Sequence, residues 1–364
     1  MYSLALVLYH FIFFRRLYQN PYLLSTAEIA STFFPHWIWM GRKWQATDNI
    51  YYKYPACIPF LSMFYPPSII LSKITKYLSL DIDMKIYIYF ILSHFLLGSL
   101  LAYHLTHSLF FAITVAYSGY MIKPHTPPAV YTMMWIPGCF IGGWLGVLSL
   151  CMAVLGGYWP VLVYVLPVLA IVNPLCLLGL IPALPQIIPF LWYWPKSVRA
   201  VEKLDRNIGK VPWWKFKDLI WPSDSVMPTN GVNYWEMHMY MGIAPFLIWN
   251  WSWWWILLAL TVLIAIGIIP QIQRIPARVL YLLTFLISYF SILNSGLQNL
   301  ALLSLLNAFL LLRNSEVLAS FPLTQWWNKP SKLYSKPITD SWPFFSGYLF
   351  NKKLRDYRGA FALR

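Results

Sequence analysis

Charge is scarce in this sequence, and negative charge is the scarcest. Only 11% of the 364 residues are charged, and Asp and Glu together number 12. Ordinary soluble domains carry about 25% charged residues. Because 59% of the residues are hydrophobic, the composition excludes an ordinary soluble domain and predicts a polytopic membrane protein in contact with membrane lipids.

Cysteine is scarce too, and several signatures of cytosolic chemistry are missing. The four cysteines show no C-x-x-C spacing, and three of them lie in apolar runs, where a thiol behaves as a small hydrophobic group. This pattern suggests neither a zinc site nor a disulfide framework. The sequence also lacks a Walker loop, a dinucleotide fingerprint and an H-E-x-x-H motif, which disfavours cytosolic nucleotide chemistry.

Positive charge is comparatively plentiful. The 27 Lys and Arg residues give a net charge of +15. In a membrane protein, such an excess more often reflects contact with anionic lipid headgroups than binding of nucleic acid. We therefore expect no nucleic-acid partner.

Long apolar runs dominate the sequence and predict an all-α fold with about eight transmembrane segments, two of them short. A full span needs about 20 residues, so the first run is an incomplete helix. The charges Arg15 and Arg16 follow that run instead of preceding it, which favours a retained anchor over a cleaved signal. The predicted segments are Tyr2–Phe14, Met84–Tyr103, Ser108–Ile122, Trp135–Gly157, Pro160–Leu180, Ile243–Ile268, Val279–Leu293 and Gly296–Leu312.

Two long loops interrupt these runs, at residues 15–83 and 195–242. The first is expected to lie along the membrane with short amphipathic helices near Ala27–Gly41 and Pro67–Leu78. A shorter polar loop is expected at Lys123–Thr132. The alternation of spans places both long loops on the outer face, and the basic tail at residues 313–364 in the cytoplasm, behind a transmembrane domain of residues 1–312.

The stretch Val211–Gly242 combines several Trp with carboxylates beside an apolar run. Trp and Tyr favour the headgroup layer, because each has an apolar body and one polar group. Carboxylates next to a bilayer require water, a cation or a chemical role. Glu236, three residues after Asn233, is the carboxylate least well explained by an aromatic belt alone.

A set of short motifs occurs in a recognisable order. The set resembles the YfhO-type family of bacterial membrane proteins, relatives of the GT-C glycosyltransferases, and covers roughly Glu28 to Pro245. The motifs are Glu28…Phe34-Pro35, Tyr51…Pro55, Phe64-Tyr65-Pro66, Met134-Trp135-Ile136-Pro137, Leu155-Gly156-Gly157, Ser197-Val198-Arg199-Ala200, Trp221-Pro222, and Asn233-Tyr234-Trp235-Glu236…Tyr240-Met241-Gly242.

The resemblance implies a GT-C-like membrane enzyme of the bacterial cytoplasmic membrane. Its active site would lie at the outer face, where a sugar moves from a polyprenyl-phosphate carrier to an acceptor of the cell envelope. In the family pattern an acidic residue, commonly Asp, stands seven positions before Pro; here Glu28 and Pro35 match it. Family members are usually longer than this chain, which makes it a shortened member.

Glycosyl transfer needs a carboxylate to accept a proton and cationic groups to stabilise the departing phosphate. Glu28, Asp48 and Glu236 are the candidate catalytic carboxylates, and Asp224 is a candidate ligand for Mg²⁺ or Mn²⁺, which prefer oxygen donors. Asp48 and Asp224 also suit turns, where they would have no catalytic role. The divalent cation is therefore left open.

A basic cluster and three aromatic or polar residues complete the expected substrate-binding set. Arg199, Lys203 and Arg206, with Lys210 beyond them, suit a phosphate, although lipid headgroups would satisfy the same charges. Tyr234, Trp235 and His36 stand near the candidate carboxylates in sequence.

His94 lies inside a predicted span, where a polar residue is a functional candidate. A neutral imidazole hydrogen-bonded to a neighbouring helix is the alternative. For the whole chain, two classes of function remain: a glycosyltransferase that uses a lipid-linked sugar, and a non-catalytic membrane protein of the same fold that binds lipid, transports or serves as a partner subunit.

Overall fold

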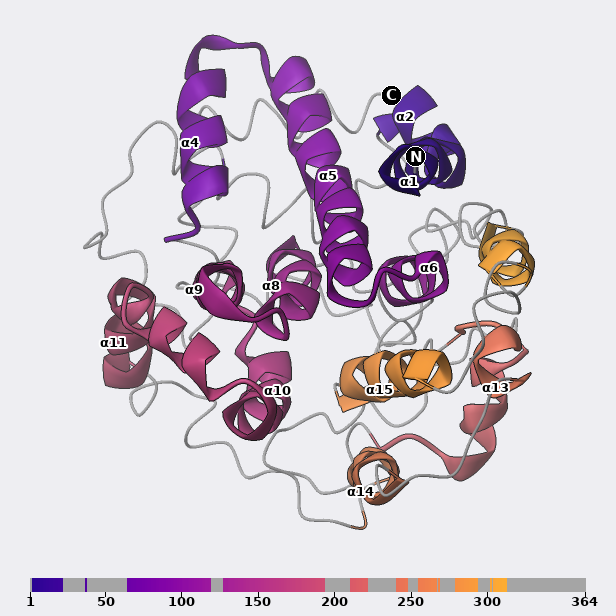
Figure 1. The fold of residues 1–364 in the computed structure, drawn as a ribbon. Helices are drawn as coiled ribbons and strands as arrows, with labels where there is room; N and C mark the ends of the chain where they lie inside the picture. The colour runs from indigo at the N-terminus through magenta and orange to yellow at the C-terminus, as the bar shows by residue number, and fades with distance from the viewer. Residues whose placement is uncertain are drawn as a thin grey trace, which may run out of the picture.

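The computed structural model describes residues 2–21, 37, 64–118, 127–193, 210–221, 240–247, 255–266, 268, 279–293, 302 and 304–312. All regular structure in these ranges is helical (Figure 1), which confirms the all-α prediction for this part of the chain. The elements are α1 (Tyr2–Phe13), α2 (Arg15–Gln19), α4 (Pro66–Ile74), η5 (Thr75–Tyr77), α5 (Leu80–Thr106), α6 (Leu109–Tyr117), α8 (Pro127–Cys139), α9 (Gly143–Gly156), α10 (Trp159–Val172), η6 (Pro174–Leu180), α11 (Leu184–Tyr193), η8 (Trp213–Leu219), α13 (Ala244–Leu247), α14 (Trp255–Ala265) and α15 (Leu280–Leu293).

Helix α5 contains the segment that is long and apolar enough to cross a bilayer by itself. This segment runs from Ile82 to Thr106, a length of 25 residues. A bent pair, Pro174–Leu180 and Leu184–Leu191, would add a second span if its two parts, inclined at 72°, cross together. Among the described residues, length and composition thus support one membrane-crossing helix, or two with the bent pair.

Both ends of α5 have local causes. The Ser79 hydroxyl accepts a hydrogen bond from the Ile82 amide at 3.4 Å, which caps the first turn. At the other end His107 adopts a left-handed backbone with φ of 54°, a conformation that ends a helix. The predicted span Met84–Tyr103 is confirmed as the interior of this helix.

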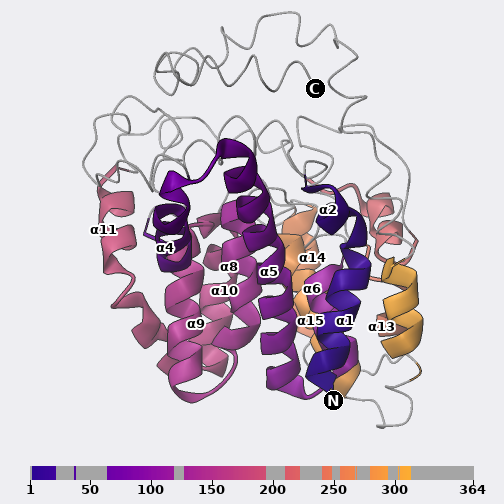
Figure 2. The same cartoon turned by 90° about the horizontal axis from the view of Figure 1, so that it is seen from above.

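Helix α1 packs antiparallel to α5. Aromatic pairs connect the two helices in opposite order: Tyr2 with Tyr103, Phe14 with Phe95, and then Tyr18, in α2, with Tyr89, at centroid separations of 6.1, 5.1 and 5.5 Å. Figure 2 shows α1 and α5 side by side. The first apolar run is therefore a packed helix of the bundle.

Where one span was predicted at Trp135–Gly157, the structure has an antiparallel hairpin of α8 and α9. Helix α8 ends at Cys139, and α9 starts at Gly143, which has a positive φ of 68°. The Thr132 hydroxyl donates to the Ala153 carbonyl at 2.9 Å and accepts from the Tyr158 amide at 2.9 Å, which ties the far ends together. The prediction of a single helix was wrong because sequence hydropathy does not register a turn within an apolar run.

The start of α8 corrects a second boundary. Residues 127–132 were predicted to belong to a polar loop, but they form the first turns of α8. The helix begins at the pair Pro127-Pro128, and proline is tolerated in the first turn because its missing N–H would have no helical partner there.

The predicted span Pro160–Leu180 is also divided, at Asn173, between α10 and η6. The Asn173 side chain donates to the carbonyls of Cys139 and Ile141, at 2.8 and 3.0 Å. These acceptors lie at the turn between α8 and α9, so one amide satisfies carbonyls that the helix end leaves free. The bend therefore connects η6 to the hairpin.

Within the predicted span Ile243–Ile268, the described residues form helices α13 and α14. Near the end of the second, the Ala265 carbonyl accepts a hydrogen bond from the Val211 amide at 2.9 Å, and Val211 belongs to the central loop. A single straight crossing would take Ala265 away from that loop, so this contact does not support the expected order of spans here.

Helix α15 confirms the predicted segment Val279–Leu293 but not its expected direction. The Tyr281 hydroxyl donates to the Met133 carbonyl at 3.1 Å, and Phe285 stacks on Phe140 at 4.8 Å. The contacts ascend together along both helices, so α15 runs parallel to α8, whereas the alternation of spans predicted opposite directions.

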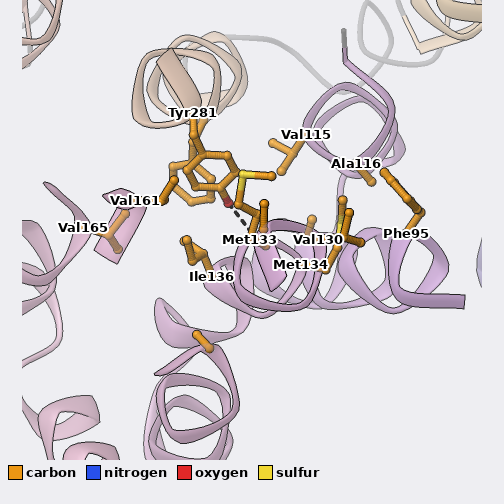
Figure 3. Packing of buried hydrophobic residues seen from close by; sticks show 14 of the residues in the cluster. Phe95, Val115, Ala116, Val130, Met133, Met134, Ile136, Val161, Val165 and Tyr281 are labelled. Carbon is orange, nitrogen blue, oxygen red and sulfur yellow. Dashed lines mark hydrogen bonds between the residues drawn. The ribbon is translucent and has the colours of Figure 1, made fainter. Parts of the chain in front are cut away.

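Helix α8 forms the centre of the packing. Figure 3 shows Val130, Met133, Met134 and Ile136 of α8 among side chains of four other helices, including Tyr281 of α15. Each of these van der Waals contacts is small, but together they contribute substantially to the stability of the packing.

Other predicted segments are only partly described. Pro67–Leu78 is helical as expected, through α4 and η5, and Ser108–Ile122 is helical over α6. Gly296–Leu312 is helical at residues 304–312. Apart from Trp37, Ala27–Gly41 lies outside the described residues, as does the tail at residues 313–364.

Candidate functional site

The residues predicted to form the active site lie outside the described residues. These are Glu28, Asp48, Glu236, Asp224, Arg199, Lys203, Arg206, Tyr234, Trp235 and His36. Their mutual distances therefore stay predictions. The described residues contain no group of three or more His, Cys, Asp or Glu arranged to hold a metal ion, and the expected cation ligands are not among them.

One carboxylate of the central loop, Asp218, is among the described residues, and it is paired with a lysine side chain. Asp218 and Lys215, three residues apart in η8, form a buried ion pair. The exposed face of the same short helix carries Trp213, and Trp221 follows, with 79% and 77% of their surfaces exposed. The arrangement supports the predicted surface position of this segment, and it gives Asp218 a structural role.

The most developed polar arrangement in the described residues joins Tyr65, His94 and Trp135. The Trp135 indole N–H donates to the Tyr65 hydroxyl at 2.8 Å, and the same hydroxyl lies 2.7 Å from His94 Nε2. His94 Nδ1 lies 2.7 Å from the Phe90 carbonyl. We call Tyr65, His94 and Trp135 the buried junction.

The partners of the buried junction determine its protonation. A carbonyl only accepts, so His94 Nδ1 carries a proton and donates it to Phe90. If Nε2 were protonated too, it and Trp135 would both donate to the Tyr65 oxygen, and the Tyr65 proton would have no acceptor within the junction. The neutral imidazole accepts from Tyr65 and satisfies every group, which agrees with the interpretation of His94 as a neutral, hydrogen-bonded histidine.

Helix geometry explains why these side chains meet. Helices α5 and α8 approach closely at Gly98, one turn after His94, where an added Cβ would lie only 3.2 Å from Met134 Cα. Small residues permit such close backbone contact in membrane helices. With α5 and α8 parallel at this distance, His94 and Trp135 both reach Tyr65, which directly precedes α4.

Aromatic rings enclose the junction. Tyr131, one turn before Trp135, stacks on Tyr65 with centroids 4.9 Å apart, and Phe90 meets His94 edge-on at 4.6 Å. Burial raises the pKa of Tyr65 well above its usual value, although the hydrogen bond from Trp135 opposes the shift. Tyr65 is therefore a neutral donor at physiological pH.

The junction is suited to positioning rather than to acid–base chemistry. Its nitrogen atoms and its hydroxyl proton are engaged, which leaves no free base to accept a proton from a substrate. What it does fix is Tyr65, a residue of the first long loop, against α5 and α8. Two of the ordered motifs, Phe64-Tyr65-Pro66 and Met134-Trp135-Ile136-Pro137, are joined by a direct hydrogen bond.

The motif Leu155-Gly156-Gly157 also has a packing role. An added Cβ at Gly156 would lie 2.8 Å from both the Thr132 amide nitrogen and its hydroxyl oxygen. Gly157 has a positive φ of 84° and ends α9. Both glycines therefore close the α8–α9 hairpin beside Tyr131.

A second buried histidine was not singled out from the sequence. His10 in α1 lies 2.8 Å from the Tyr18 hydroxyl through Nε2 and 3.1 Å from the Tyr117 hydroxyl through Nδ1. The sequence held one signal: His10, Phe14 and Tyr18 follow each other at four-residue spacing, which places them on one helical face. The arrangement connects α1, α2 and α6.

Comparisons with known proteins return no relatives for this chain: no family model, no curated protein and no solved structure matches it.

Proposed function

We propose that this chain is a multi-pass protein of the bacterial cytoplasmic membrane and a GT-C-like relative of the YfhO-type family. Its activity would be transfer of a sugar from a polyprenyl-phosphate carrier to an acceptor of the cell envelope at the outer face. The helical architecture and the apolar helix α5 support the membrane part of this proposal.

The buried junction is the observation that carries the proposal. A GT-C-like site requires the first long loop to be held against the membrane helices, because that loop supplies a catalytic carboxylate. Tyr65 is held on α5 by His94 and on α8 by Trp135. Glu28 and Asp48 precede Tyr65 in the same loop.

The reaction needs few protein groups. The acceptor hydroxyl attacks the anomeric carbon, the bond from that carbon to the phosphate oxygen breaks, and the polyprenyl phosphate leaves with the bonding electrons. Glu28 or Asp48 takes the proton of the acceptor, with Glu236 as the alternative base. Arg199, Lys203 and Arg206 stabilise the phosphate, and Tyr234, Trp235 and His36 contact the sugar or the carrier.

Asp224 and Glu236 offer the oxygen donors that Mg²⁺ or Mn²⁺ prefers, and such an ion would supply further positive charge to the leaving phosphate. The alternative function, a non-catalytic membrane protein of the same fold, is favoured by one feature: the buried junction satisfies its own polar groups and needs no substrate.

Charge-conserving substitutions test the donor site. Arg199 can contact a phosphate through two parallel N–H groups, whereas Lys203 acts as a point charge. We expect Arg199→Lys to weaken binding of polyprenyl phosphate markedly and Lys203→Arg to be tolerated, measured by equilibrium binding to the purified protein. Equal affinity in the two variants would mean that Arg199 does not hold the phosphate and that total charge governs lipid contact.

A further inference from the structure

The carboxamide of Asn307 has a fixed orientation inside the bundle. Asn307 is fully buried, and its Nδ2 donates to the Thr114 hydroxyl at 2.7 Å. That hydroxyl donates its own proton to the Phe110 carbonyl at 2.8 Å. Thr114 can therefore only accept from Asn307, which fixes the amide nitrogen toward α6 and the oxygen on the opposite side.

The Asn307 oxygen points at Gly242. An added Cβ at Gly242 would overlap Asn307 Oδ1 and would lie 3.2 Å from Asn307 Cγ. Gly242 also has a positive φ of 84°, which disfavours any side chain. Oδ1 has no hydrogen-bond partner among the described residues, so its neighbour there is the glycine backbone, which a weak Cα–H···O contact would suit.

The residues beside Gly242 are held as well. Tyr240 and Met241 are buried, and the Met241 amide donates to the Leu219 carbonyl at 3.0 Å. On the other side of residues 304–312, the Tyr9 hydroxyl donates to the Ala308 carbonyl at 3.0 Å. The end of the central loop is thus enclosed between η8 and a helical stretch that is itself attached to α1 and α6.

We infer that Asn307 is a positioning residue for the end of the central loop: held by Thr114, its carboxamide fixes Gly242 and the described residues 240–242, which follow Tyr234, Trp235 and Glu236 in the sequence. The catalytic consequence of this positioning rests on the proposed function, in which the segment that holds these three residues contacts the substrate. The mechanical part, fixation of residues 240–242 by Asn307, stands apart from any activity.

Hydrogen exchange of the full chain in lipid nanodiscs tests the mechanical part. The reporter is the Met241 amide. Asn307→Leu fills nearly the same volume but removes the bond to Thr114 and the contact of Oδ1 with Gly242, so we expect exchange at Met241 to rise about tenfold, as for loss of one buried hydrogen bond. Ser288→Ala, which removes a buried hydroxyl whose partner among the described residues is the Thr284 carbonyl of its own helix, is the control and should leave exchange at Met241 unchanged.

A second pair of variants separates contact from backbone strain. Gly242→Ala should raise exchange at Met241, and adding Asn307→Ala should reverse part of that rise, because the overlap with Oδ1 disappears. Unchanged exchange in Asn307→Leu, or simple multiplication of the two single effects in the double variant, would overturn the inference.

Turnover of a polyprenyl-phosphate sugar separates the positioning role from the proposed function. Asn307→Leu should lower turnover, and its unfolding midpoint should equal that of Ser288→Ala. Equal turnover in these two variants would refute the positioning role. An inactive wild-type protein would instead refute the proposed function and leave the exchange result standing.

Discussion

At the scale of single residues, the polar side chains buried in this bundle are paired in ways that identify their protonation. Three elements contribute to the buried junction, and one phenol serves both neighbours: Tyr65 accepts from Trp135 and donates to His94. A polar group buried without its partner costs far more than the hydrogen bond contributes. The phenol oxygen of Tyr65 is therefore the atom on which the junction depends most.

We expect Tyr65→Phe to lower the free energy of unfolding by about 1–3 kcal/mol, because both His94 Nε2 and the Trp135 indole N–H lose their partner in an apolar interior. Denaturant titration in detergent micelles measures this. Tyr77→Phe is the matched control, since Tyr77 is 86% exposed and should change little. Equal effects of the two substitutions would show that the hydroxyl of Tyr65 stabilises nothing.

At the scale of elements, close packing of short helices replaces two of the spans that hydropathy predicted, Trp135–Gly157 and Pro160–Leu180. The α8–α9 hairpin illustrates this, since Gly156 lies against Thr132 and the Asn173 side chain ties the turn to η6. The backbone groups at the turn of this hairpin find hydrogen-bond partners because η6 packs against it through Asn173.

Gly156→Ala should destabilise the hairpin by about 1–3 kcal/mol, the usual cost of forcing extra volume into a packed interior. Gly142→Ala supplies the control, because an added Cβ there meets nothing within 4 Å. Thermal unfolding of both variants in the same detergent is the measurement. The packing account is contradicted if Gly142→Ala is as destabilising as Gly156→Ala.

How much of the fold could be predicted from the sequence depends on the element. Helix α5 was predicted because its apolar run is continuous. The division of Trp135–Gly157 was not, since Gly and Pro in apolar runs are compatible with a straight helix, a kink or a turn. Contacts between distant parts of the chain distinguish them, such as those of Asn173 with the carbonyls of Cys139 and Ile141.

The candidate site was predictable to a smaller extent. The neutral state of His94 was anticipated as one of two interpretations, but its partner Tyr65 lies 29 residues away, a separation at which no helical periodicity applies. The pairing of Trp135 with Tyr65 depends on the approach of α5 and α8 at Gly98. Neither pairing is encoded in a local pattern.

At the scale of the whole molecule, the direction of the helices decides which loops share a membrane face. The hydrogen bond from Val211 to Ala265 places the end of α14 beside η8. Helix α15 runs parallel to α8, so these two helices start on the same side of the bundle. This direction agrees with the position of the end of α14 beside η8. The expected alternation between residues 195 and 293 therefore needs revision.

Cysteine labelling tests this revision. Trp221 and Ile268 are exposed, at 77% and 68%, so Trp221→Cys and Ile268→Cys should react with an impermeant maleimide from the same side of the membrane. Reaction from opposite sides would restore a single crossing by residues 243–268 and contradict the packing of Val211 on Ala265.

The central claim is that the carboxylates of the two long loops catalyse sugar transfer. The most direct measurement is transfer of radiolabelled sugar from a polyprenyl-phosphate donor by membranes that carry the full chain. Glu28→Gln and Glu236→Gln keep the shape of the side chains but remove the charge, and loss of a general base typically costs about 10²–10⁴-fold in rate. We predict such losses, with Glu316→Gln in the tail as an active control; transfer at the original rate with both substitutions would contradict catalysis and leave the non-catalytic alternative.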